Sequence, residues 1–329
     1  MPAKTSHRKT NRGLKKTFIV LALAVAVYTA IVFLSDTEKI FGAVSGIQLY
    51  WIPLFLSLSI LNYLLRFLKY QYFLSRVDVH VPWRESLKIF LAGFSMTVSP
   101  GKLGELLKSY LMKQRRGIPV STTSPVVIAE RITDLISMVC IALIGLLLVQ
   151  HRGAALAVAA GAVFIALAMI FLLWEKPFKA CTGLICRIEK VGRHREKMEG
   201  FQKNCACLLD GRSLAVSVPL GILSWGAEAL VLCLVSMSLG IQPGLSVGLA
   251  LLAHSAGTIA GAVSMIPGGL GLTEVTIGAI LTTVMSEPAA AATTLVMRFA
   301  TLWFAVVLGA AVLGIMKRSQ RSKRKNEGT

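Results

Sequence analysis

The sequence predicts an all-α polytopic membrane protein with about six full spans and two re-entrant hairpins arranged as an inverted repeat. Of the 329 residues, 55% are apolar and only 16% are charged, whereas charged residues make up about 25% of an average soluble domain. The mean hydropathy is +0.68, and several apolar runs reach about 20 residues, the length that a helix needs to cross a bilayer. Two other apolar regions are interrupted by proline and glycine in matching motifs.

The composition excludes several classes of protein. A soluble protein with so few charged residues could not cover its surface with polar groups, and the apolar content excludes a disordered chain. The formal net charge is +19, from 35 Lys and Arg against 16 Asp and Glu. A nucleic-acid-binding protein could carry this charge, but not together with apolar runs of about 20 residues. Nucleic acid is therefore not an expected partner, and the basic residues are expected mostly in loops.

Uninterrupted apolar runs predict the full spans. We expect a basic tail over 1–16, a single membrane domain over 17–316 and a second basic tail over 317–329. The first apolar run follows a basic start, as in signal peptides, but it has no clear small-residue cleavage site, so we interpret it as a retained signal anchor. The predicted spans are residues 17–35, 49–74, 124–150, 154–174, 214–239 and 290–316.

Two further apolar regions contain helix breakers at their centres. Residues 86–113 are interrupted at 99–104, and residues 245–286 are interrupted at 266–271. Proline ends a helix, and glycine permits the turn that follows. The arms of the first region have about 13 and about 10 residues, too few to cross a core about 30 Å thick, and this predicts a re-entrant hairpin. The second region has longer arms, so two separate spans are an alternative to a hairpin there.

Basic residues are unevenly distributed over the predicted loops. Both tails and the loop 175–213 fall on one side of the topology, whereas the opposite side has Lys39 and Arg152. The positive-inside rule then places both termini in the cytoplasm. We expect a multi-pass protein of the inner (plasma) membrane whose basic tails are attracted to anionic lipid.

An internal repeat relates the two halves of the membrane domain. The motif P-G-K-L-G-E at 100–105 is similar to P-G-G-L-G-L-T-E at 267–274, and the offset of 167 residues between the two prolines also relates Arg131 to Arg298. The same offset superimposes the flanking spans. The two repeats cover about residues 49–150 and 214–316. The predicted topology gives them opposite orientations, a recurring plan of secondary transporters with discontinuous helices.

Several ionisable residues lie within the predicted membrane domain, where burying a charge is costly and indicates function by default. A guanidinium matches phosphate bidentately, so Arg131 and Arg298 are candidates to bind an anionic head group. The alternative is that they pair with carboxylates, for which Glu228 and Glu274 are the expected partners of Arg298. The candidate substrate-binding residues are Lys102, Glu105, Arg131, Glu228, Glu274 and Arg298. The candidate structural or hinge residues are Pro100, Gly101, Gly104, Glu130, Asp134, Pro267, Gly268, Gly269 and Gly271.

Other polar residues are given structural interpretations. Arg66 and Lys69 lie at the cytoplasmic end of the span 49–74, and we interpret them as anchors that snorkel to the membrane surface. The six cysteines match no zinc-binding spacing, and no nucleotide-binding or catalytic motif occurs in the sequence. We therefore expect no metal, no cofactor and no enzymatic activity.

The motifs, in their order and spacing, are similar to those of a known family. The runs P-G-K-L-G-E-L-L-K-S-Y-L (100–111), A-E-R-I-T-D-L (129–135) and I-P-G-G-L-G-L-T-E (266–274) resemble the lysylphosphatidylglycerol synthase transmembrane-region family, also called the flippase-like domain family. In multidomain members, this region is linked to the flipping of an aminoacylated phospholipid that a soluble C-terminal domain makes. The resemblance implies roles for the motif residues already named. Because this sequence ends in a basic tail, we expect a stand-alone member without the synthase activity.

Three functions are compatible with these observations. The leading hypothesis is a lipid flippase, which requires a polar site in a groove that opens sideways to lipid. A solute or ion transporter would instead have an aqueous cavity closed to lipid. An accessory or lipid-modifying enzyme would use Glu130 or Asp134 as a base near a head-group site. The candidate partners are a membrane lipid as substrate, a lipid-synthesising enzyme and a second copy of the chain.

Overall fold

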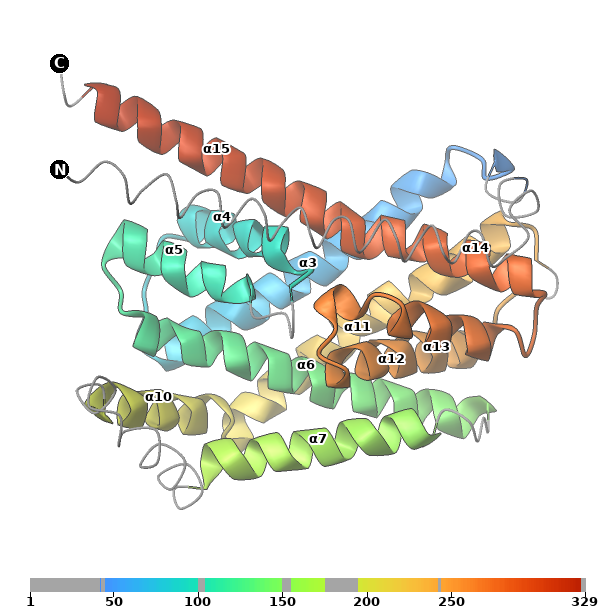
Figure 1. The fold of residues 1–329 in the computed structure, drawn as a ribbon, viewed down its shortest axis with the longest axis horizontal. Coiled ribbons are helices and arrows are strands. Elements are labelled where there is room, and N and C mark those ends of the chain that lie inside the picture. The colour runs from blue at the N-terminus through green and yellow to red at the C-terminus, as the bar shows by residue number, and fades with distance from the viewer. Residues whose placement is uncertain are drawn as a thin grey trace.

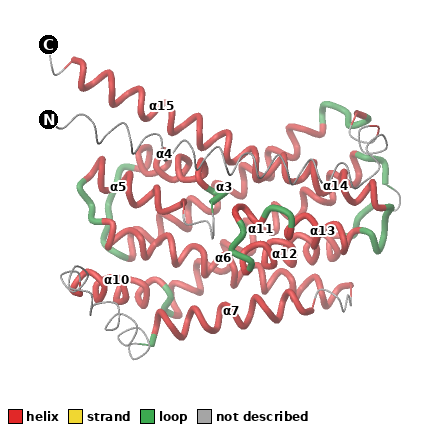
Figure 2. Tube along the Cα trace, in the orientation of Figure 1, coloured by secondary structure: helices red, strands yellow, loops and turns green. Residues whose placement is uncertain are grey.

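The described part of the chain is helical and contains no strand (Figure 1; Figure 2). The computed structural model describes residues 42, 45–99, 104–149, 155–174, 195–241 and 244–326. The predicted tail 1–16, the predicted span 17–35 and the first part of the loop 175–213 lie outside the described residues. The same is true of the candidate residues Pro100, Gly101 and Lys102.

Among the described residues, four helical segments are long and apolar enough to cross a membrane. They are α3 (Trp51–Arg76), α6 (Val120–Val149), α11 (Gly211–Ser238) and the segment Glu287–Ser319. That last segment consists of α14 (Glu287–Arg298), the π-helical turn η5 (Phe299–Trp303) and most of α15 (Phe304–Asn326). These segments coincide with the predicted spans 49–74, 124–150, 214–239 and 290–316.

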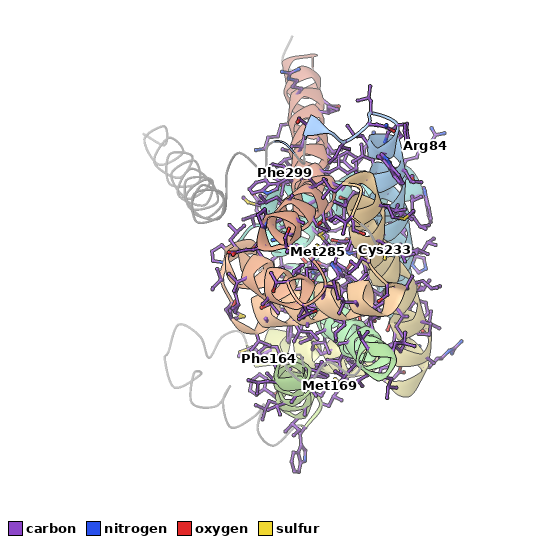
Figure 3. All side chains as sticks on the ribbon, turned by 90° about the vertical axis from the view of Figure 1, so that its right-hand side faces the viewer. Arg84, Phe164, Met169, Cys233, Met285 and Phe299 are labelled. Carbon is purple, nitrogen blue, oxygen red and sulfur yellow. The ribbon has the colours of Figure 1, made fainter. Side chains whose placement is uncertain are left out.

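Two other helices complete one side of the bundle. The apolar helix α7 (Ala155–Leu173) coincides with the predicted span 154–174, and the more polar α10 (Arg195–Leu208) follows it. Both pack against α6. Large apolar side chains such as Phe164 on α7 and Phe299 lie on the outer surface of the bundle (Figure 3). An apolar outer surface suits the hydrocarbon core of a membrane. The helices suit it as well, because each helix satisfies its backbone hydrogen bonds internally.

Each of the two interrupted regions folds into a pair of short helices. The first hairpin consists of α4 (Trp83–Gly93), the 3-10 turn η1 (Phe94–Met96) and α5 (Leu107–Arg116). The second hairpin consists of α12 (Val247–Val263), the turn η4 (Pro267–Gly269) and α13 (Leu272–Leu281). The helices have 11, 10, 17 and 10 residues, fewer than the about 20 that a full span needs. Within each pair the two helices contact one another.

The two halves of the chain contact each other through equivalent elements. Helices α3 and α11 pack along each other; α4 and η1 pack on α15 of the second half, and α12 packs on α6 of the first half. A glycine permits close approach where α6 crosses α12, because a Cβ on Gly145 would lie 2.7 Å from the backbone nitrogen of Leu252. A second glycine does the same where α15 crosses α4, because a Cβ on Gly309 would lie 2.8 Å from the carbonyl oxygen of Leu91. Each hairpin is thus held by the last long helix of the other half.

The tips of the two hairpins meet in the middle of the molecule. In Figure 1, α4 and α5 extend inward from the end at which α15 terminates, whereas α12 and α13 extend inward from the opposite end. Gly268 at the second tip has φ 64°, and a Cβ there would lie 3.0 Å from Cγ1 of Val98 at the first tip. Val98 also packs with Leu270 and Leu302. The midpoint of the bundle is therefore built from both halves.

An ion pair joins one end of α3 to the start of α11. Arg76 Nη2 lies 2.5 Å from Asp210 Oδ2, and Asp210 Oδ1 accepts a hydrogen bond of 2.7 Å from the backbone N–H of Ser213. Asp210 is thus the N-cap of α11. The N–H of Ser213 and the charge of Arg76 hold the pKa of Asp210 below its ordinary value, so this contact persists at neutral pH.

Candidate functional site

Charged side chains of α3, the first hairpin and α6 form one buried ion-pair network. Its members are Arg66, Lys69, Glu105, Lys108, Glu130, Arg131 and Asp134. All are buried except Arg131, whose side chain is 18% exposed. Charges at this depth are stable only when they are paired and hydrogen-bonded. The network therefore fixes how these three elements pack.

Asp134 is the point at which three helices meet in this network. Its Oδ1 accepts hydrogen bonds from Lys69 Nζ of α3 and, at 3.0 Å, from Trp225 Nε1 of α11. Its Oδ2 lies 2.9 Å from Arg131 Nη2 of the same helix. This carboxylate consequently ties α3, α6 and α11 together.

Lys108 connects the first hairpin to α6. Its Nζ lies 2.6 Å from Glu130 Oε2 and 3.3 Å from Glu105 Oε2, and it sits 5.1 Å from the ring centroid of Tyr70. Arg131 Nη2 lies 3.2 Å from the same oxygen of Glu105. Glu105 is therefore shared between a lysine of its own hairpin and an arginine of the neighbouring long helix.

The second half contains an equivalent pair. Arg298 Nε lies 2.6 Å from Glu274 Oε1, and Arg298 Nη2 donates a hydrogen bond of 2.9 Å to the carbonyl oxygen of Gly268. Glu274 Oε2 accepts a hydrogen bond of 2.7 Å from the backbone N–H of Gly271. In each half, the arginine of a long helix thus pairs with the glutamate that follows the Pro-Gly motif of the same half. The expected partnership of Arg298 with Glu274 is confirmed.

Two residues interpreted as surface anchors belong to the buried network instead. Lys69 is 1% exposed and Arg66 is 6% exposed, so the prediction that they snorkel to the membrane surface is wrong. They lie on the face of α3 that packs against the other helices, and carboxylates of α6 and the first hairpin lie within ion-pair distance of them. A buried partner of opposite charge retains each side chain in the interior.

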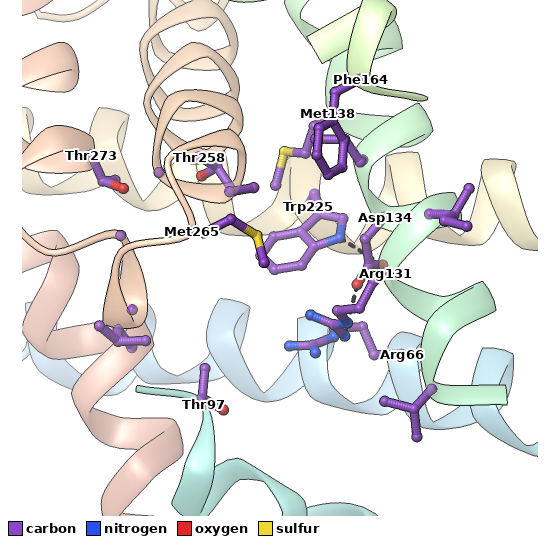
Figure 4. A pocket seen from close by; sticks show the side chains of 18 of the residues that line it. Arg66, Thr97, Arg131, Asp134, Met138, Phe164, Trp225, Thr258, Met265 and Thr273 are labelled. Carbon is purple, nitrogen blue, oxygen red and sulfur yellow. Dashed lines mark hydrogen bonds and ion pairs between the residues drawn. The ribbon is translucent and has the colours of Figure 1, made fainter. Parts of the chain in front are cut away.

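A pocket of about 330 Å³ lies between the two halves (Figure 4). Arg66, Arg131 and Arg298 all line it, and so do Asp134 and Glu228. The structure thus brings together the two arginines that the sequence singled out, although they are far apart in the chain, and adds a third from α3. Glu105 and Glu274 do not line the pocket; they contact its arginines from behind.

The pocket has a polar end and an apolar end. In Figure 4, Arg66 and Arg131 lie on one side of the Trp225 ring, and Met138 and Phe164 lie on the other. The apolar end is formed by α6 and by α7, which has no charged side chain. An elongated ligand with a charged group and a hydrocarbon part would fit this distribution.

The hairpin tips contribute backbone and a hydroxyl to the pocket. Thr97, Gly268 and Gly269 line it. The first tip is closed by a hydrogen bond of 2.7 Å from the backbone N–H of Gly104 to Ser99 Oγ. At the second tip, η4 begins at Pro267, and three glycines have positive φ angles, a conformation that glycine adopts more readily than other residues. These glycines are Gly268, Gly269 and Gly271.

Sequence reasoning missed Lys108 and Trp225. Lys108 follows Glu105 by three residues, a spacing at which side chains on a helix meet, and this signal could have identified it. Trp225 lies in an apolar span, where nothing in the sequence distinguishes it from a packing residue. Within the described residues, no cluster of three or more His, Cys, Asp or Glu is placed to bind a metal ion.

This architecture defines a multi-pass helical membrane protein with a buried charged pocket between two halves. The model of the family described as "Lysylphosphatidylglycerol synthase TM region" matches residues 19–309, and the chain belongs to this family. The chain is also similar to the UPF0104 membrane protein MJ1078 of Methanocaldococcus jannaschii. The two are 24% identical over 241 residues, which are 71% of this chain and 99% of the relative. The family membership indicated by the three motifs is confirmed.

Proposed function

We propose that the protein is a lipid flippase, which moves a phospholipid or lipid-linked head group between leaflets through this pocket. The proposal is supported by one observation: three arginines and a wall of apolar side chains line the same pocket. Guanidinium groups bind phosphate oxygens bidentately, and the wall of α6 and α7 suits hydrocarbon chains. A free solute would gain nothing from that wall, which favours lipid over the solute-transporter alternative.

The geometry disfavours the alternative that the protein is a lipid-modifying enzyme. A general base must be available to take a proton from the substrate. Glu130 does not line the pocket and is held by Lys108 at 2.6 Å. Asp134 does line it, but its oxygens already contact Lys69, Trp225 and Arg131. Both carboxylates are better suited to hold the helices together.

We also infer that the two halves form an inverted repeat with alternating access. The inference is supported by the reciprocal packing of α4 on α15 and of α12 on α6, and by the arrangement of the hairpins at opposite ends of the molecule in Figure 1. The first tip would then close the pocket from the cytoplasm and the second from outside. In this orientation both tails are cytoplasmic, in the plasma (inner) membrane, and the basic end of α15 meets anionic lipid.

Single cysteines at the bases of the two hairpins test this orientation. Arg84 and Ser286 are exposed at the start of α4 and before α14, and each is changed to Cys in a chain whose native cysteines are replaced by serine or alanine. A membrane-impermeant maleimide is expected to label Ser286→Cys in intact cells and Arg84→Cys only after permeabilisation. Labelling of both positions from one side would refute the inverted repeat.

Reconstitution of the purified chain tests the flippase itself. Liposomes containing the protein and fluorescently labelled phosphatidylglycerol are treated with dithionite, which bleaches the outer leaflet. The protein is expected to increase the bleached fraction beyond the outer-leaflet share, either passively or under an applied proton gradient. Empty liposomes are the control. Failure to move lipid, together with uptake of a soluble organic phosphate, would establish the solute transporter instead.

A further inference from the structure

The polar end of the pocket contains donors that have no hydrogen-bond partner among the described residues. They are Arg66 Nε, Arg66 Nη2, Arg131 Nε and Thr97 Oγ1. Arg66 is 6% exposed and Thr97 is 7% exposed, so these groups are not open to bulk solvent. Leaving a buried donor unpaired costs free energy. The chain therefore leaves room for acceptor atoms that it does not itself supply.

Arg66 is held in one orientation by aromatic rings. Its guanidinium carbon lies 5.1 Å from the ring centroid of Phe94 and 5.0 Å from that of Trp225. Arg66 Nη2 also lies 3.9 Å from Glu105 Oε1. Aromatic rings satisfy the faces of a guanidinium and leave its N–H edge available for hydrogen bonds. That edge lines the pocket beside Arg131 (Figure 4).

The contact of Arg66 with the ion-pair network is longer than the contacts of its two lysines. Lys69 and Lys108 are each within 3 Å of a carboxylate oxygen, whereas Arg66 Nη2 lies 3.9 Å from Glu105 Oε1. A guanidinium at membrane depth is stabilised by an anionic group within hydrogen-bond distance.

We propose that Arg66, Arg131 and Thr97 form a subsite for the singly charged phosphodiester of a lipid, with Arg66 as the specificity-determining residue. A phosphodiester has one negative charge, which two guanidinium groups can bind. Its oxygens accept hydrogen bonds from the N–H groups of both arginines and from the hydroxyl of Thr97. These unpartnered donors favour the phosphate at this position over a cationic substituent of the lipid. This inference rests on the proposed function and adds the chemical class of its substrate.

Equilibrium binding tests the subsite. The full chain in detergent is titrated with short-chain phosphatidylglycerol below its critical micelle concentration, and binding is followed by thermophoresis. Arg66→Gln is expected to weaken binding by at least about tenfold, since it removes a charge-assisted hydrogen bond. Thr97→Val, which removes only the hydroxyl, is expected to weaken binding about threefold, whereas Thr97→Ser retains it. Arg116→Gln is the matched control, because Arg116 pairs with Glu85 outside the pocket.

The outcomes separate the subsite from the flippase activity. Wild-type affinity in both Arg66→Gln and Thr97→Val, with unchanged melting temperatures, would overturn the subsite. Inorganic phosphate that binds as tightly as the lipid would also overturn it, because the ligand would then be a free anion. Wild-type protein that binds the lipid but does not move it in liposomes would refute the flippase and leave the subsite standing.

Discussion

Replacement of Arg131 or Arg298 by alanine is expected to abolish lipid translocation while the protein remains folded. Each arginine lines the pocket from a different half of the chain. Each charge-assisted, bidentate contact to a phosphate contributes about 3 kcal/mol, so its loss lowers the rate about 100-fold. The initial rate of dithionite bleaching in proteoliposomes measures the effect, and size-exclusion chromatography with thermal unfolding verifies the fold.

Matched variants separate loss of the site from loss of the fold. Arg298→Ala leaves Glu274 buried without its ion-pair partner at 2.6 Å, so the double variant Arg298→Gln with Glu274→Gln removes both charges together. It is expected to fold and still not transport. Arg115 lies outside the pocket and donates a hydrogen bond to the carbonyl oxygen of Met316, so Arg115→Gln is expected to transport normally. Wild-type rates in Arg131→Ala and Arg298→Ala would eliminate the head-group site.

The replacement of Asp134 by asparagine is expected to destabilise the protein strongly. This carboxylate pairs with Lys69 and Arg131 and also accepts a hydrogen bond from Trp225. Removing one partner of a buried ion pair leaves the other charges uncompensated and costs about 3–5 kcal/mol in free energy of unfolding. The expected result is a large fall in the unfolding midpoint of the detergent-solubilised protein.

A compensating variant tests the cause of that loss. The double change Lys69→Met with Asp134→Leu removes both charges of one pair, and we expect it to recover part of the stability that Asp134→Asn loses. Glu85→Gln is the surface control: it breaks the partly exposed pair with Arg116, and such pairs contribute about 1 kcal/mol or less. An unfolding midpoint of Asp134→Asn equal to that of the wild type would show that the network does not hold the bundle together.

Much of the site could be predicted from residues that carry a strong local signal. Hydropathy located α3, α6, α11 and the α14–α15 segment, because a chain in hydrocarbon must satisfy its backbone within apolar helices. The repeated Pro-Gly motifs located both hairpins. The equal offset of Arg131 and Arg298 from those motifs identified the two arginines that line the pocket.

Other residues of the site carry no such signal. Arg66 and Lys69 lie near the end of an apolar run, where a basic side chain commonly reaches the membrane surface. Their inward orientation depends on carboxylates of α6 and the first hairpin, which lie far away in the sequence. The sequence gives no indication of a special role for Trp225 either. Its role becomes visible in the structure, where its indole N–H donates a hydrogen bond to Asp134. Only the packing of several helices decides the direction of these side chains.

The sequence by itself determined that this is a helical membrane protein of its family, where its long helices lie, and that charged residues flank two broken regions. These properties follow from composition, hydropathy and motif spacing, which are local. The tertiary structure decided that arginines of α3, α6 and α14 share one pocket, with Glu105 and Glu274 behind it. The physical reason is that a buried charge takes its orientation from partners on other helices, and those partners meet only when the two halves pack together.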